Sequence, residues 1–206
     1  MLKSQRKKTG VGMLIAEAVL IMISVVLGLM ANEWRVSRDN EKEAVNALAF
    51  IREELETNRE RIEEILPYHE QITDSLSVLM NRVFTTGAPV STMEMFKAMP
   101  GGFSTPLVSR NSWELVNQTG AINHVDFNLA ISLSRLYDLQ AFYQKKIDLI
   151  GQNVYVAGNI NPQDQGAAVI AFGLLANDIA IQERRLIKQY PPMVAKLDSA
   201  MTNYTK

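Results

Sequence analysis

VGMLIAEAVLIMISVVLGLMA, residues 11–31, is a continuous apolar stretch that only Glu17 and Ser24 interrupt. As a helix at about 1.5 Å per residue, it spans roughly 30 Å, the thickness of the hydrocarbon core of a bilayer. Its eleven Val, Leu and Ile residues each favour insertion by about 0.3 to 0.6 kcal/mol. One acid in mid-membrane opposes insertion by about 2.5 to 3.5 kcal/mol, so insertion prevails. The stretch predicts one transmembrane helix over residues 11–34, with Trp34 at the far interface.

The charges on either side of this helix predict its orientation. Four basic residues precede it, Lys3, Arg6, Lys7 and Lys8, whereas the charges that follow it are mixed. By the positive-inside rule, residues 1–10 form a cytoplasmic tail, and the C-terminal domain lies on the far side of the membrane. A cleaved signal peptide is the alternative. The apolar region exceeds the usual ~7 to 15 residues, however, and no clear A-x-A-like site precedes Asn32.

Small residues recur along one side of the apolar stretch, which is typical of helices that approach each other closely. The predicted helix-helix seam comprises Gly12, Ala16, Glu17, Ser24, Gly28 and Ala31. An acid within a membrane normally faces protein or water, so Glu17 is expected to contact a second copy of the chain or another membrane protein. The alternative, which the sequence leaves equally open, is an acid near enough to the cytoplasmic interface to stay hydrated.

Residues 35–84 predict a long stalk helix that continues from the membrane helix. Apolar residues recur in alternating steps of three and four, as in a coiled coil: Leu48, Ile51, Leu55, Ile62, Ile65, Ile72, Leu76, Leu79 and Val83. Pro67 predicts a kink or a break. Asn58 and His69 occupy two positions of the same stripe. We interpret both as hydrogen-bonded bundle residues rather than as ligands, because no second histidine or carboxylate lies at ligand spacing from His69.

Residues 85–110 are rich in glycine and proline and predict an irregular connector. Within it, Ser91 and Glu94 have the spacing of a capping box and predict one short helix. The methionines and phenylalanines of this region, Met93, Met95, Met99, Phe96 and Phe103, favour core packing, with an exposed adaptable surface as the alternative.

Residues 111–206 predict the remaining helices. Asn111 and Glu114 indicate one helix start and Asp126 another, and Gly120 is expected to end the first helix in a left-handed conformation. Further signals are a start at Asn161 and Pro162 and a stop at Pro191 and Pro192, followed by a last short helix. Apolar stripes on each segment predict an all-α fold, an antiparallel bundle that follows the transmembrane and stalk helix. Trp113, Tyr137 and Tyr143 are expected either in the core or as walls of a pocket.

Composition excludes several classes of protein. With a formal net charge of -1 over 206 residues, the chain has no broad attraction for nucleic acid. With 0 cysteines it has neither a disulfide framework nor a thiolate nucleophile. It contains no G-x-S-x-G, H-E-x-x-H, Walker or G-x-G-x-x-G motif, so we expect no enzymatic activity, no catalytic residues, no cofactor and no metal site.

Two stretches resemble a known family. The first comprises the anchor and the start of the stalk: Ile15, Ala16 and Glu17, the run to Asn32, Glu33 and Trp34, and residues 47–55. The second comprises Ser112, Trp113, Glu114, Thr119, Gly120, Ala121, Ile122, Leu133, Tyr137, Gln140 and Tyr143. Both resemble the DUF6090 type of bacterial membrane-anchored proteins. The anchor departs from the family form, because methionines and alanines replace part of its aliphatic run. The resemblance implies a helix in a bacterial inner membrane with the C-terminal domain in the periplasm, and it adds little about mechanism.

Two functional hypotheses follow from these observations. The first is a membrane-anchored interaction or scaffold protein, an accessory or oligomeric component of an inner-membrane assembly whose partners are the bilayer and either a second copy or another membrane protein. The alternative is an extracytoplasmic sensor that binds a small molecule between its helices and signals through a membrane partner. The short cytoplasmic tail, which has no room for an output domain, favours the first.

Overall fold

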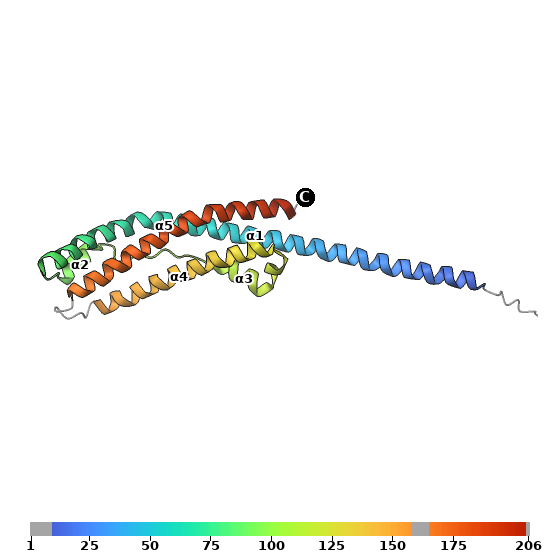
Figure 1. Cartoon of the computed structure of the whole chain (residues 1–206), viewed down its shortest axis with the longest axis horizontal. Helices are drawn as coiled ribbons and strands as arrows, with labels where there is room; N and C mark the ends of the chain where they lie inside the picture. Colours follow the sequence, from blue (N-terminus) through green and yellow to red (C-terminus); the bar gives the residue numbers. More distant parts are fainter. Residues whose placement is uncertain (1–9, 158–164, 205–206) are drawn as a thin grey trace, which may run out of the picture. The chain divides into compact units, whose positions relative to one another are not determined.

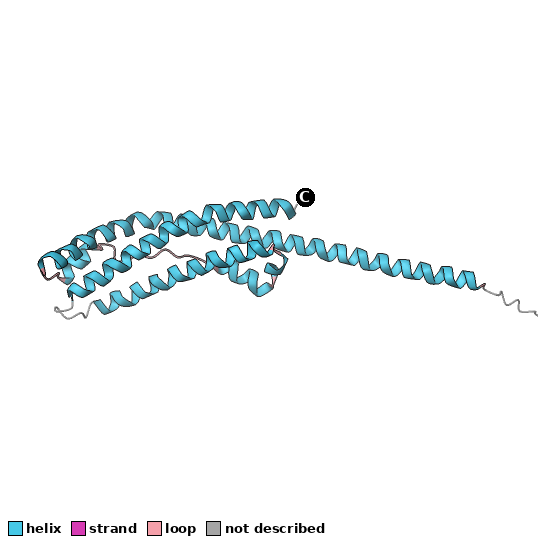
Figure 2. Cartoon of the chain, in the orientation of Figure 1, coloured by secondary structure: helices cyan, strands magenta, loops and turns pink. Residues whose placement is uncertain are grey.

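A computed structural model describes residues 10–157 and 165–204, with side chains described up to residue 149 and from residue 165 onward. The elements in this part of the chain are all helical (Figures 1 and 2). They are α1 (Val11–Thr86), α2 (Thr92–Ala98), α3 (Asn111–Thr119), the 3-10 helix η1 (Ala121–His124), α4 (Phe127–Ala157) and α5 (Gln165–Tyr204). The predicted all-α class and the long N-terminal helix with an apolar beginning are confirmed.

The chain divides into two compact units, with the boundary after Glu43. The first unit is helical from Val11, and the side chains of residues 11–31 are all exposed. A window of 18 residues in α1 has a mean hydropathy of 2.5 and is 0% buried. By length and composition α1 is therefore a candidate membrane span. Helix α5 also meets these criteria, with a window of mean hydropathy 1.2 that is 39% buried.

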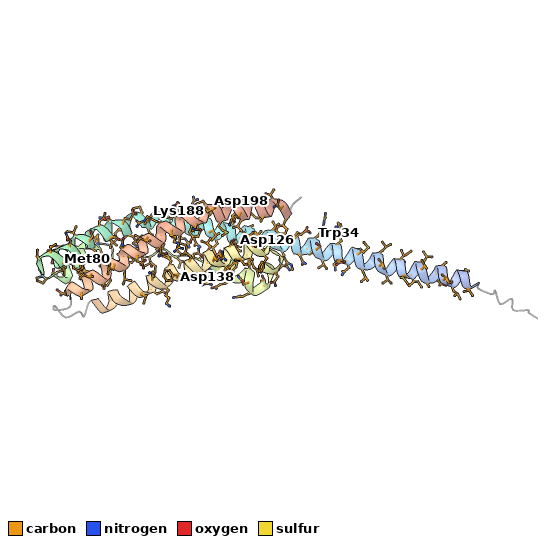
Figure 3. The ribbon with its side chains drawn as sticks, viewed as in Figure 1. Trp34, Met80, Asp126, Asp138, Lys188 and Asp198 are labelled. Atoms are coloured by element: carbon orange, nitrogen blue, oxygen red, sulfur yellow. The ribbon has the colours of Figure 1, made fainter. Side chains whose placement is uncertain are left out.

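The second unit, from Ala44 onward, contains the core. The part of α1 that belongs to this unit packs with α4 and α5, and their side chains fill the space between the three helices (Figure 3). The largest fully buried side chains are Leu48, Ile51, Leu55, Ile62, Ile72, Leu76, Leu133, Tyr137, Tyr143, Ile179 and Tyr190. Those of α1, together with Leu133 and Tyr143 of α4 and Ile179 of α5, lie in the apolar stripes of the sequence. Tyr137, expected in the core or as a pocket wall, lies beside the α4 stripe, and Tyr190 precedes the predicted stop at Pro191.

Ion pairs and hydrogen bonds fix how α5 lies along its neighbours. Arg52 on α1 pairs with Asp198 at 2.6 Å, and Glu70, further along α1, pairs with Arg184 at 2.6 Å. On α4, Gln140 bonds to Tyr190 and Tyr143 bonds to Glu183. Residue numbers fall along α5 as they rise along its neighbours, so α5 runs opposite to α1 and to α4.

The prolines inside the helices show where burial overrides a local signal. Helix α1 continues through Pro67 without a break. The predicted stop at Pro191 and Pro192 is wrong, because α5 runs on to Tyr204. Tyr190, Met193 and Leu197 are buried on one face on both sides of the prolines. Burial of this face outweighs the cost of a proline in a helix, about 3 kcal/mol.

Three of the predicted helix ends are confirmed. Ser91 and Glu94 form the capping box of α2, Gly120 ends α3 with φ 80°, and the Asp126 carboxylate accepts from the Leu129 N–H at 3.0 Å. Asn111 is the first residue of α3, but its side chain does not cap the helix, since Arg110 occupies the cap position. The predicted start at Asn161 and Pro162 lies outside the described residues.

Candidate functional site: a buried polar layer beneath the connector

The polar residues on the inner face of α1 hold the segment that joins α1 to α3, residues 87–110, which we call the connector. Outside α2 this segment is not helical, so its backbone N–H and C=O groups need other partners. Asn58 is fully buried and provides two of them: its Nδ2 donates to the Ser109 carbonyl at 2.6 Å, and its Oδ1 accepts from the Ser109 N–H at 2.8 Å. Asn58 thus provides the donor and the acceptor that a neighbouring strand would provide to an extended segment in a sheet.

Glu54 lies one turn earlier on α1 and is 7% exposed. Its Oε2 accepts from the Ser109 hydroxyl and from the Ser112 N–H, each at 2.8 Å. Its Oε1 accepts from the Tyr137 hydroxyl at 2.7 Å. One carboxylate therefore joins α1, the connector, the first turn of α3 and α4.

His69 joins another set of segments further along α1. Its Nδ1 lies 2.7 Å from Glu183 Oε1 on α5, and its Nε2 lies 2.7 Å from the Ser104 carbonyl of the connector. The ring stacks on Phe103 with centroids 4.5 Å apart. Because a carbonyl oxygen only accepts, Nε2 carries a hydrogen. Glu183 Oε1 also accepts from the Tyr143 hydroxyl at 2.7 Å, so this cluster unites α1, the connector, α4 and α5.

Two further side chains of α1 fasten the connector. The Tyr68 hydroxyl donates to the Gly102 carbonyl at 2.7 Å and accepts from the Gly101 N–H at 2.9 Å. Arg61 donates to the Leu107 carbonyl at 2.6 Å. The connector is therefore held along most of its length between α2 and α3.

The buried tyrosines act as hydrogen-bond donors to the two carboxylates. Burial raises the pKa of Tyr137 and of Tyr143 far above its usual value, and the adjacent Glu54 and Glu183 raise it further. Burial also raises the pKa of Tyr190, which accepts from Gln140 Nε2 at 2.7 Å. These hydroxyls keep their protons and stabilise the core.

The predicted site residues fall into separate groups. Asn58 and His69 bond to the connector, as described above. Tyr137 and Tyr143 are buried in the core, and Trp113 is half-buried and stacks on Tyr137 at 5.0 Å between centroids. The seam residues of the apolar stretch lie along α1 with exposed side chains, and Ser24 donates to the Leu20 carbonyl of its own helix at 2.8 Å.

The connector methionines divide between the two alternatives. Met95 and Met99 are buried in the core, in line with the favoured interpretation. Met93 is 63% exposed and Phe96 53% exposed, so part of the aromatic and methionine side chains of this region faces solvent.

Glu54 and Glu183 were not predicted as buried. Glu54 lies three residues after Ile51 and four before Asn58, on the buried stripe of α1. Glu183 lies four residues after Ile179 on the corresponding stripe of α5. This spacing is the signal that would have identified both.

Two hollows adjoin the polar layer. One of about 170 Å³ lies between the connector and α4 and includes Ser109, Arg110, Gln140 and Lys145 in its lining. Within residues 10–157 and 165–204, no group of three His, Cys, Asp or Glu side chains is placed to hold a metal ion. The polar layer described here is thus built from hydrogen bonds within the protein.

Comparisons of this chain with protein-family models, with curated proteins and with solved structures give no match. Interpretation therefore rests on the chemistry of the chain itself. That chemistry consists of an exposed apolar helix and a core whose acidic, amide and imidazole groups bind the connector.

Proposed function

We propose that this protein is a membrane-anchored interaction or scaffold protein without enzymatic activity, an accessory or oligomeric component of a bacterial inner-membrane assembly. The observation that carries the proposal is the contrast between the two units. Residues 11–31 expose every apolar side chain and have no buried core of their own, whereas the unit that begins at Ala44 contains a buried apolar core. Exposed apolar surface of this extent is costly in water and favourable in lipid.

The buried polar layer supports a structural role for the groups that resemble catalytic ones. The carboxylates of Glu54 and Glu183 and the ring of His69 are bonded to other segments of the fold. A general acid or base must reach a substrate proton, and both nitrogens of His69 already face an acceptor inside the protein. A protein that presents a rigid helical surface needs such internal bonds and no reactive group.

The proposal includes the topology expected from the charges. The N-terminal tail lies in the cytoplasm, and the second unit forms an antiparallel helical bundle in the periplasm. The opposite directions of α5 and its two neighbours support the bundle. The Glu17-containing anchor and the region around Trp113 support membership in the DUF6090-like family.

Two experiments test the proposal. Protease added to intact spheroplasts should degrade the second unit, whereas the outer membrane of intact cells should protect it. A protected C-terminal half in spheroplasts, or a mature protein that begins near Asn32, overturns the topology. Extraction of the tagged chain in mild detergent at native level should recover a defined oligomer or a partner protein. Recovery as a monomer without a partner overturns the scaffold role.

The hollow beside Gln140 favours a second candidate, a sensor of small molecules. Gln140 is 3% exposed, and its Oε1 has no hydrogen-bond partner in the described part of the chain. A ligand that binds only the folded protein raises its melting temperature. A screen of metabolites by thermal shift, repeated on Gln140→Leu, therefore decides between the two candidates.

A further inference from the structure

The outer side of α4 and α5 exposes four large apolar side chains, which we call the α4/α5 patch. They are Phe142 and Leu149 on α4, 50% and 42% exposed, and Leu174 and Ile181 on α5, 58% and 45% exposed. Within each helix the two residues are seven positions apart, so they lie on the same side of that helix. Scattered apolar residues are normal on a protein surface, whereas a paired arrangement on two adjacent helices marks an interface.

An ion pair sets the register of the patch. Lys146 lies between Phe142 and Leu149 and pairs with Asp178, which lies between Leu174 and Ile181. Because α4 and α5 run in opposite directions, Phe142 and Ile181 lie about one turn from the ion pair at one end, and Leu149 and Leu174 about one turn from it at the other. On both helices the spacing alternates between four and three residues, which is the spacing of helix-packing seams.

The composition of α5 is a second, independent observation. Its most apolar window reaches a mean hydropathy of 1.2, although only 39% of that window is buried. A helix that only covers one face of a core is polar on its outer side. Helix α5 therefore carries more apolar surface than its own core uses.

We propose that the α4/α5 patch is the contact surface for a second copy of this chain, related by a two-fold axis through the Lys146–Asp178 pair. The patch has one positive and one negative charge at its centre and apolar side chains at both ends. A two-fold rotation brings Lys146 of one copy toward Asp178 of the other and apolar ends onto apolar ends, so the surface complements itself. The Lys146 Nζ lies 4.6 Å from the centre of the Phe142 ring, which holds the lysine beside the apolar side chains.

This inference rests on the proposed function, since two copies anchored in one membrane meet at a high effective concentration. A modest patch then suffices for dimerisation. The chain has 0 cysteines, so an introduced cysteine is cross-linked only to a second copy or to another protein.

The test uses the full chain in its native membrane with Ile181→Cys and a thiol-specific bifunctional cross-linker of about 10 Å, the spacing of packed helices, because the two-fold places Ile181 opposite Phe142 of the other copy. The matched control is Val78→Cys, because Val78 is also exposed, at 69%, and lies on α1 outside the patch. The expected result is a cross-linked dimer from Ile181→Cys in several-fold excess over Val78→Cys. Equal cross-linking at the two positions, no cross-linking, or a link to a different protein overturns the inference.

A second variant tests the patch without cross-linking at Ile181. Leu149→Cys should also form the dimer, and the double change Phe142→Glu and Ile181→Glu should abolish it, since it places like charges at the contact. These exposed positions should leave the helical circular dichroism of the chain unchanged. A dimer that persists overturns this surface as the contact. Recovery of the Ile181→Cys chain in the soluble fraction instead contradicts the membrane anchor. This outcome distinguishes failure of the proposed function from failure of the proposed dimer contact.

Discussion

Glu54 on α1 caps α3, a helix that begins 57 residues later, by accepting a hydrogen bond from the Ser112 N–H at 2.8 Å. The cap residue of α3, Arg110, makes no side-chain bond of this kind. The first N–H groups of a helix need acceptors and favour a negative charge. A carboxylate from a distant helix thus replaces the local cap and ties the end of the connector to the core.

Replacing Glu54 should destabilise the fold strongly. Glu54→Ala leaves the Ser112 N–H, the Ser109 hydroxyl and the Tyr137 hydroxyl without their shared acceptor, at a cost of about 2 to 4 kcal/mol in the free energy of unfolding. Chemical unfolding followed by circular dichroism measures the loss. Glu53→Ala, at the exposed neighbouring position, should change stability by less than about 0.5 kcal/mol. Equal effects of the two changes would contradict the capping role.

Asn58 should control the connector in particular. Asn58→Ala removes both bonds to the backbone of Ser109, so the connector should open locally more often than the rest of the core. Hydrogen exchange of the Ser109 N–H should accelerate by at least about tenfold, which corresponds to about 1.4 kcal/mol. The amides of α5 around Ile179 provide the internal control. Acceleration of the same size at these amides would indicate a loss of global stability rather than local opening of the connector.

Gly173 should be required for the close packing of α5 against Met80 of α1. A Cβ at this position would clash with Met80 Sδ, so Gly173→Ala forces the methionine to move. Overpacking costs about 1 to 3 kcal/mol and exceeds the gain of about 1 kcal/mol that alanine brings to a helix. In a Met80→Ala background the same change should become neutral or stabilising. A double-mutant cycle of unfolding free energies measures this reversal, and stabilisation by Gly173→Ala alone would refute the close contact.

The capping box of α2 should make the stability of the protein depend on pH in the acidic range. A hydrogen bond from Arg82, together with the backbone and hydroxyl bonds of Ser91, lowers the pKa of Glu94 from 4.5 to about 2. Because the folded pKa is the lower one, the stabilisation is fully present above pH 4.5 and is lost as the pH falls toward 2. The melting temperatures of wild type and Glu94→Gln should therefore converge over this range. An NMR titration of Glu94 that gave its ordinary pKa would contradict the prediction, and Arg82→Gln should raise that pKa.

Glu17 should contribute to self-association within the membrane if it faces a neighbouring helix. Glu17→Leu removes the ionisable group and keeps the segment apolar, so insertion should be unaffected or improved. Oligomer recovery from membranes should fall relative to wild type. Oligomers unchanged by Glu17→Leu would assign Glu17 to the hydrated interface and leave the α4/α5 patch as the remaining proposed contact.

The sequence alone determined the all-helical class and three of the helix ends. The capping box at Ser91, the left-handed Gly120 and the Asp126 cap depend on residues three or four positions apart, and the buried stripes of α1 and α4 follow from helical periodicity. Such signals are local, because the groups that interact are brought together by the helix itself.

Only the tertiary structure decided the polar layer and the path of α5 through its prolines. Glu54 meets Tyr137 and His69 meets Glu183 because three helices and the connector pack together, and no local pattern encodes partners 83 or 114 residues apart. At Pro191 the local signal pointed to a stop, but burial of Tyr190, Met193 and Leu197 on one face continued the helix. Burial energy is a property of the assembled core, which is why the sequence specified the helices while packing decided which of their polar groups became internal.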